Sequence, residues 1–238
     1  MSADTATPKA FIAALQVIAD PGKVTGVAKF FHADPNGLAK DNKFMGIGPG
    51  DVFPIAKQFA AMTLPDIERL LDNPHYEVRL GAVSIMDFQA RAKRITADQR
   101  AALYELYLRR HDRINNWDLV DRAAPYVVGG YLDDRPRSIL DQLAGSANPW
   151  ERRTAIVSTY YFIRKGDTGD TFRIARLLVH DAHPLVQKAV GSWVREAGKQ
   201  DPASLLAFLD EFAATMPRVI LRYAVEKLSA AQRDRYMK

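Results

Sequence analysis

Trp117 and Asp121 are the two residues whose types and spacing most directly suggest chemistry. They lie four positions apart in WDLVDRAAPYVV, so on a helix they occupy neighbouring positions of one face. The apolar stripe of this stretch comprises Val120, Ala123, Ala124 and Val127. At the edge of such a stripe a carboxylate beside an indole is partly desolvated, so it needs a cationic partner or a task in which negative charge meets a cation. We therefore expect either a structural ion pair of Asp121 with Arg122 or Arg153, or a catalytic role.

Residues 184–199 offer a second chemically suggestive pattern, because their two predicted faces separate cleanly. One face follows the i, i+3, i+4 spacing of an apolar helix stripe, with Val186, Ala189, Val190, Trp193, Val194 and Ala197. The opposite ridge holds Lys188, Ser192, Arg195 and Lys199. We expect no acid within this ridge, and three cations with a hydroxyl would suit a phosphate backbone. The structural alternative is a solvated helix face.

The stretch 150–165 carries two adjacent arginines, Arg152 and Arg153, which must lie on different faces of a helix. Spacing alone leaves open which of them is available to a ligand. His180 and His183 are three residues apart, but Pro184 indicates that one helix ends between them, so we expect no metal site there. The sequence contains neither HExxH nor Gly-x-Ser-x-Gly, and metal or serine-nucleophile chemistry is therefore unsupported.

Composition narrows the classes of function further. The chain has 238 residues, a net charge of +5 and no cysteine, which excludes disulfides, thiolate metal sites and a cysteine nucleophile. Residues 151–199 contain nine basic and five acidic residues, most of the total excess. The first thirty residues do not resemble a secretory signal, and no apolar run reaches about 18 residues. We expect a soluble, cytoplasmic protein without a membrane partner.

The elements that must position these side chains are predicted to be helices. Apolar residues recur at helical spacing almost throughout, and the expected helices are 8–19, 23–32, 51–61, 65–73, 76–92, 97–110, 116–129, 136–145, 150–165, 170–180, 184–199, 202–214 and 217–235, the last broken near Ser229. Residues 33–50 are expected to form an extended connection. Similar helix openings recur at Asn73, Asn115, Asn148 and His183, at steps of 42, 33 and 35 residues.

Steps of that size with two helices per unit are typical of HEAT or armadillo repeats. The predicted fold is an all-α, right-handed superhelical solenoid of antiparallel helix pairs, with a concave basic cleft, formed by one domain over residues 1–238.

Four motifs of this chain together resemble the AlkD-type family of DNA alkylation repair glycosylases. VAKFFHA followed by KFMGI resembles the family's opening helix and its Phe-Leu-Gly-Ile signature. WDLVD resembles Trp-Asp-x-Val-Asp, which implies Asp121 as the catalytic carboxylate beside Trp117. WERR resembles Trp-x-x-Arg, which implies Arg153 as the DNA-facing arginine. In QKAVGSWVREAGK, the family order is matched by Lys188, Gly191 and Arg195.

Two positions depart from the family pattern. The second active-site Trp of the family aligns with Ser192, whereas the Trp of this chain stands one residue later, at Trp193. One residue on a helix is about 100° of rotation, so Trp193 faces either the core or the cleft. Phe30 stands where the family has a Tyr, and the hydrogen bond of that hydroxyl is lost.

The resemblance implies a hydrolase of N-glycosyl bonds that excises purines alkylated at N3 or N7, such as 3-methyladenine and 7-methylguanine, in base excision repair. It also implies that no base is flipped into a pocket, that no cofactor or metal is used, and that a monomer acts on double-stranded DNA, associated with the nucleoid when bound. The implied catalytic residues are Asp121 and Trp117, and the candidate DNA contacts are Phe30, Arg152, Arg153, Lys188, Ser192, Trp193 and Arg195. The alternatives are a non-catalytic HEAT-like DNA-binding relative and a protein-interaction scaffold.

Overall fold

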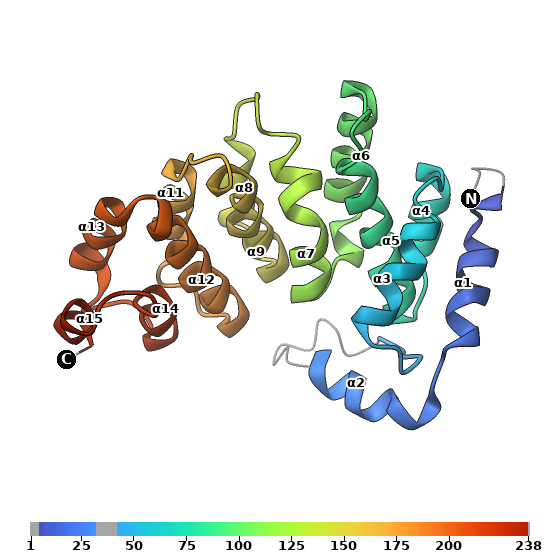
Figure 1. The fold of residues 1–238 in the computed structure, drawn as a ribbon, viewed down its shortest axis with the longest axis horizontal. Coiled ribbons are helices and arrows are strands. Elements are labelled where there is room, and N and C mark those ends of the chain that lie inside the picture. Colours follow the sequence, from blue (N-terminus) through green and yellow to red (C-terminus); the bar gives the residue numbers. More distant parts are fainter. Residues whose placement is uncertain (1–4, 32–41, 238) are drawn as a thin grey trace. The chain divides into compact units, whose positions relative to one another are not determined.

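The computed structural model describes residues 5–31 and 42–237, and the part it describes is built from helices (Figure 1). Within those ranges there is no β-strand, and one isolated bridge joins Lys43 and His75. The all-α prediction is therefore confirmed. The ten residues 32–41, which fall in the predicted helix 23–32 and the predicted connection 33–50, lie outside the described part of the chain.

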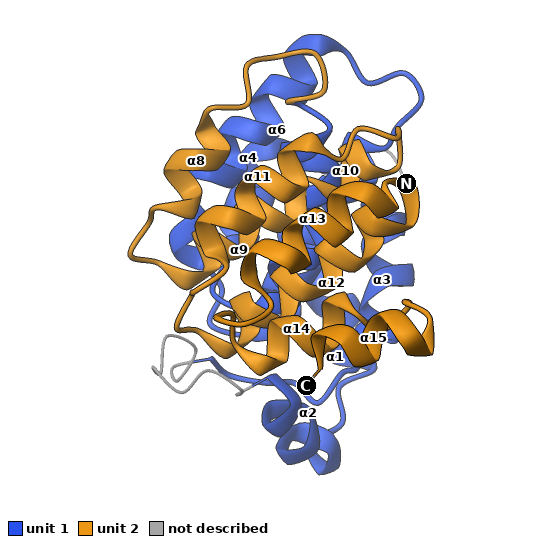
Figure 2. Cartoon of the chain, turned by 90° about the vertical axis from the view of Figure 1, so that its left-hand side faces the viewer, with its two compact units in different colours: residues 1–131 blue, residues 132–238 orange. Residues whose placement is uncertain are grey.

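The contacts of the chain divide it into two compact units, residues 1–131 and 132–238 (Figure 2). The helices of unit 1 are α1 Pro8–Val17, η2 Pro21–Lys23, α2 Val24–Phe31, α3 Pro49–Gln58, α4 Leu64–Leu71, α5 Tyr76–Ala90, α6 Ala97–Arg109, η3 His111–Arg113, α7 Trp117–Ala124 and the π-helix η4 Pro125–Gly129. The helices of unit 2 are α8 Ile139–Ala144, α9 Pro149–Ser158, α10 Tyr160–Ile163, α11 Gly169–Leu178, α12 Pro184–Gln200, α13 Pro202–Phe212, α14 Arg218–Ala224 and α15 Ala230–Tyr236.

Several helix starts follow capping residues that the sequence supplies, whereas α5 begins after His75 without a side-chain cap, two residues beyond the predicted opening at Asn73. The side chains of Asn116 and Asn148 accept the backbone N–H groups of Trp117 and Trp150, at 2.8 and 3.0 Å. Ser229 forms a capping box at the start of α15, which confirms the predicted break in the last helix. These caps satisfy amide groups that a first helical turn leaves without an intrahelical partner.

Two predicted helices are interrupted where their backbone cannot continue regularly. Residues 116–129 form α7 and then the π-helix η4, because Pro125 has no N–H to donate and the Gly130 amide bonds to its carbonyl at 3.1 Å. Residues 150–165 break at Thr159. There the Ser158 and Thr159 hydroxyls donate to backbone carbonyls of the preceding turn, at 2.6 and 2.7 Å, and such bonds bend helices.

One helix forms the centre of each unit. In unit 1, α5 packs against α3, α4 and α7, and its residues from Tyr76 to Asp87 are all buried. In unit 2, α12 packs against α9, α11, α13 and α14 (Figure 1). Close approach requires glycine at Gly191, where an added Cβ would lie 2.7 Å from the Ile220 carbonyl oxygen. Within the described residues no helix is long and apolar enough to cross a bilayer.

We expect Gly81→Ala to destabilise unit 1, because an added Cβ would lie 2.1 Å from Cζ of the buried Phe11. Overpacking of this kind costs about 1–3 kcal/mol, measured as the free energy of unfolding in urea. Gly26→Ala in α2 is the matched control, since nothing lies within 4 Å of its added Cβ, and it should be neutral or stabilising. Equal losses in both variants would contradict the packing argument, whereas Phe11→Leu should partly rescue Gly81→Ala.

Candidate functional site

The first two turns of α7 hold the residue pair that the sequence singles out. Trp117 and Asp121 are both half-buried. The predicted apolar stripe of this helix is confirmed, with 0% exposure for Val120, Ala123, Ala124 and Val127. The cap residue Asn116 is fully buried, and its amide nitrogen donates to the Phe31 carbonyl at 2.7 Å. One side chain therefore both starts α7 and joins it to the end of α2.

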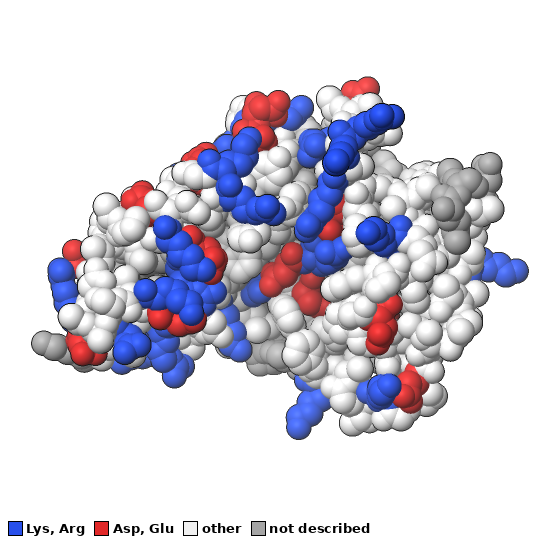
Figure 3. All heavy atoms as spheres, viewed as in Figure 1, with Lys and Arg blue, Asp and Glu red and all other residues white. Residues whose placement is uncertain are grey.

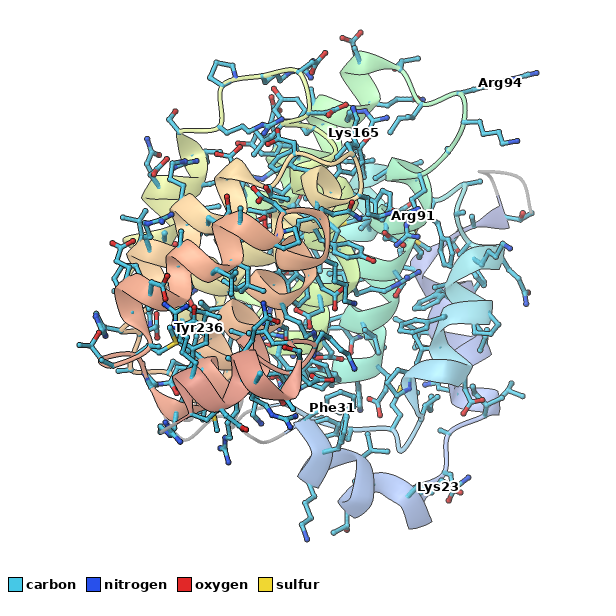
Figure 4. All side chains as sticks on the ribbon, turned by 60° about the vertical axis from the view of Figure 1, so that its left-hand side comes forward. Lys23, Phe31, Arg91, Arg94, Lys165 and Tyr236 are labelled. Carbon is cyan, nitrogen blue, oxygen red and sulfur yellow. The ribbon has the colours of Figure 1, made fainter. Side chains whose placement is uncertain are left out.

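An aromatic cluster surrounds this junction. The Phe31 ring, labelled in Figure 4, lies 4.6 Å from Tyr76 and 6.3 Å from Trp117 between centroids. Phe30 meets Trp117 edge to face at 5.5 Å and keeps 58% of its surface exposed. Aromatic pairs in such geometry add stabilisation beyond the area that they bury. The indole of Trp117 is thus held on one side by α2, and the candidate residue Phe30 lies beside it on the surface.

The KFMGI motif is held by a buried carboxylate that the sequence did not reveal. Glu77 accepts the backbone amides of Met45, Gly46 and Ile47, at distances from 2.9 to 3.2 Å, and has no exposed surface. Gly46 has a φ of +77°, and a Cβ there would lie 2.0 Å from the Asp20 carbonyl oxygen. Charge-assisted bonds to amides are strong, so Glu77 fixes the backbone of residues 45–47 against the start of α5.

Arg79, buried beside this carboxylate, ties the start of α5 to the approach of α7. Its guanidinium donates to Asn42, to the Asn73 carbonyl at 2.9 Å and to the Asn115 side chain at 3.2 Å. Burial, with a smaller effect of the nearby Arg113, lowers the pKa of Arg79 to about 10, so it is charged at neutral pH.

Arg122, the neighbour of Asp121, is directed at α5. It forms an ion pair with Asp87 at 3.1 Å, donates to Ser84, and lies over the Phe53 and Phe88 rings. Asp87 is fully buried and also bonds Arg91 at 2.7 Å. Burial raises the pKa of Asp87 although both arginines oppose it. Arg122 is one of the two arginines expected to pair with Asp121. Its ion pair is with Asp87 instead.

In unit 2 the two adjacent arginines of α9 hold neighbouring segments. Arg152 makes two bonds to Asp181, at 2.6 and 3.1 Å, and donates to the Ser146 and Ala147 carbonyls in the connection between α8 and α9. Arg153 is 5% exposed and donates to the Leu185 carbonyl in the first turn of α12. Both side chains thus connect α9 to the segments around it.

The expectation that no acid lies within the ridge of α12 is wrong. Arg195 bonds Glu196 at 3.1 Å and also Glu226 near the end of α14, while Lys199 bonds Glu196 at 2.6 Å. Burial alone would raise the pKa of Glu196, but the bonds from Lys199 and Arg195 bring it below its ordinary value. Figure 3 shows acidic and basic side chains next to each other on the drawn face of unit 2. Much of the predicted positive charge is compensated here, although Lys188 is exposed.

Trp193 is neither fully buried nor free on the surface. Its indole N–H donates to the Val157 carbonyl at 3.1 Å, and its ring meets Tyr160 edge to face at 6.0 Å. The side chain is half-buried, as is that of Ser192. Trp193 therefore anchors α12 to the break between α9 and α10.

The model of the DNA alkylation repair enzyme family matches residues 11–228. The chain belongs to this family. A solved structure described as a predicted DNA alkylation repair enzyme from Enterococcus faecalis is 16% identical, covers 89% of this chain and 97% of its own, and superposes with a TM-score of 0.66. At that identity the likeness shows the fold alone. It confirms the predicted all-α solenoid, and the concave basic cleft stays a prediction. A comparison with curated proteins finds no match.

Metal ligands are not gathered in the described part of this repair-family protein. Within residues 5–31 and 42–237, no group of three or more His, Asp or Glu side chains is arranged to hold an ion. Two of the buried acids bind protein groups instead, Glu77 the backbone amides of residues 45–47 and Asp87 the side chain of Arg122.

We expect Glu77→Gln to lower the free energy of unfolding by about 2 kcal/mol, since each bond to a charged group is worth roughly 1.5–3 kcal/mol and the amide replaces only part of the set. The measurement is urea unfolding followed by tryptophan fluorescence. Glu105→Gln, a change of the same type at an exposed position of α6, is the control. A loss no larger than that of the control would contradict the role given to Glu77.

Arg122→Met should cost about 3 kcal/mol at neutral pH, because it removes one partner of a buried ion pair. Burial raises the pKa of Asp87 in the folded protein, and loss of Arg122 raises it further. The folded variant therefore binds a proton more tightly, so its deficit is largest above that raised pKa and shrinks as the pH falls through it. Unfolding free energies measured from pH 8 to pH 4.5 test this.

The double variant Asp87→Asn/Arg122→Met should lose less stability than the sum of its two single variants. A deficit independent of pH, or strict additivity, would contradict the proposed pairing.

Proposed function

We propose that this member of the repair family is a DNA glycosylase that excises cationic N3- or N7-alkylated purines. The observation that carries the proposal is the placement of Trp117 and Asp121 on one face of the first two turns of α7, where both side chains are half-buried. The membership of the family and the WDLVD motif support the same assignment.

The chemistry of the substrate suits a single carboxylate. In an N7-alkylguanine the purine is already cationic, so the C1′–N9 bond can break with both electrons passing to a base that leaves neutral. The sugar develops oxocarbenium character, which a fixed negative group stabilises. Asp121 supplies that charge and accepts the proton of the water that attacks C1′. The products are the free base and an abasic site.

Trp117 has a positioning and electrostatic part in this proposal. Its ring packs beside the deoxyribose, where the negative π face favours a developing cation. The bond of Asn116 to Phe31 and the edge-to-face contact of Phe30 hold the indole in place. Phe30, 58% exposed, supplies apolar contact with DNA where a tyrosine hydroxyl would supply a hydrogen bond.

The remaining candidates are proposed to fall into two groups, residues that contact DNA phosphates and residues that support those contacts. Lys188 and Ser192 are the proposed phosphate contacts of α12, and Arg195 would join them only by exchanging its glutamate partners. Arg152, Arg153 and Trp193 are proposed to support this surface, since their donors are bonded to Asp181, Leu185 and Val157. The partner is double-stranded DNA bound by a monomer, and no base needs to leave the stack.

Asp121→Asn should reduce release of 7-methylguanine and 3-methyladenine from methylated DNA by about 10²–10³-fold, the usual loss when one charge-stabilising group is removed. Affinity for unmodified duplex should stay within a factor of two to three. The measurement is single-turnover release of the bases by purified protein. Asp51→Asn, an exposed acid in the first turn of α3, should leave release unchanged.

Undiminished release by Asp121→Asn would contradict the proposed role of this carboxylate. Salt-dependent DNA binding by the wild type without any release would support a non-catalytic DNA-binding relative. Salt-insensitive or undetectable binding would support a protein-interaction scaffold.

A further inference from the structure

The turn between α5 and α6, together with the first turn of α6, carries several cations that form no ion pair with the described residues. Within residues 91–100 stand Arg91, Lys93, Arg94 and Arg100, against one acid, Asp98. Lys93 and Arg94 are exposed and Arg100 is half-buried. Within residues 5–31 and 42–237 none of these three forms an ion pair, whereas Arg195 and Lys199 of unit 2 are bonded to glutamates. Figure 3 shows basic side chains in a run over the end of unit 1 where Figure 1 labels α6.

Contacts between α6 and the residues that follow the π-helix hold Arg100 in position. A Cβ added to Gly130 would lie 3.1 Å from Nη1 of Arg100. The guanidinium therefore packs against a position that has no side chain. One turn further along α6, Tyr104 stacks on Tyr131 at 4.0 Å between ring centroids. These contacts fix α6 to the end of the π-helix and hold Arg100 in place.

Arg91 and Arg94 differ in their surroundings, and Figure 4 labels both. The guanidinium of Arg91 lies 3.8 Å from the centre of the Tyr126 ring and bonds Asp87. Arg94 extends away from the ribbon into solvent. Arg91 is thus part of the packing, and Lys93, Arg94 and Arg100 are the charges available to a partner.

We propose that Lys93, Arg94 and Arg100 form a second contact surface for the phosphate backbone of DNA, in unit 1 and separate in sequence from the ridge of α12. The inference rests on the proposed function, which supplies DNA as the polyanion. The one acid of the stretch, Asp98, forms no ion pair with these three cations, and a group of cations that acids do not neutralise is suited to backbone binding, which carries no base preference. The exposed large apolar residues of the described chain are Val17, Ile18, Phe30 and Leu177. The absence of any within 91–100 argues against a membrane surface, which such segments bind with an apolar face.

The test compares Lys93→Gln/Arg94→Gln and Arg100→Gln with the wild type in binding to an unmodified duplex over a range of salt concentrations. Each phosphate contact contributes about 0.9 to the slope of log affinity against log salt. The double variant should lower the magnitude of the slope by about 1.8 and Arg100→Gln by about 0.9, while Arg100→Lys retains it. The matched control is Lys9→Gln/Lys57→Gln, which removes the same charge from exposed positions of α1 and α3 and should leave the slope unchanged.

Unchanged slopes in the variants of the turn, an equal loss in the control, or no DNA binding by the wild type would each overturn this inference. The proposed glycosylase function is tested separately, by measuring base release by the wild type at saturating protein. A wild type that binds DNA with the predicted slopes but releases no base would contradict the glycosylase assignment and leave this surface established.

Discussion

The amide of Asn116 is the interaction on which the candidate site depends. Its oxygen accepts the N–H of Trp117 and its nitrogen donates to the carbonyl of Phe31. Because both bonds come from one buried side chain, α7 cannot begin without also fixing the end of α2. The position of Trp117, the neighbouring ring of Phe30 and the exposure of Asp121 one turn later all follow from this junction.

Buried charges of α5 support that junction from within unit 1. Glu77 holds the backbone of Met45 to Ile47, Arg79 reaches the approach to α7, and Asp87 holds Arg122. Desolvating such groups is costly, and an apolar core can be equally stable without them. Their bonds are directional, however, so they set the positions of residues 42–47 and of α7 relative to α5 more narrowly than apolar packing does. This explains why a helix with so many polar residues is buried along most of its length.

Local features of the fold could be predicted from the sequence because they depend on neighbours along the chain. The cap at Asn116, the apolar stripe of Val120 and Ala123 and the break at Ser229 are of this kind. The bonds from the amides of residues 45–47 to Glu77 join residues about 30 positions apart, and Arg195 and Glu226 are 31 positions apart. The spacing of apolar residues along the sequence does not predict such long-range pairs. The sequence contains the proline at which α7 ends, Pro125. That the chain continues from there as a π-helix depends on tertiary packing, which the sequence does not show. The motifs of the site were therefore predictable, and the partners that hold or neutralise them were not.

The central claim is that Asp121 stabilises a sugar cation while the substrate base provides its own positive charge. The most direct measurement is single-turnover base release from two otherwise identical duplexes, one containing 7-methylguanine and the other hypoxanthine, a neutral purine. The account predicts release of 7-methylguanine and none of hypoxanthine above the rate without protein, since no group of the proposed mechanism protonates a neutral leaving base. Comparable release of both bases, or release of neither, would contradict it.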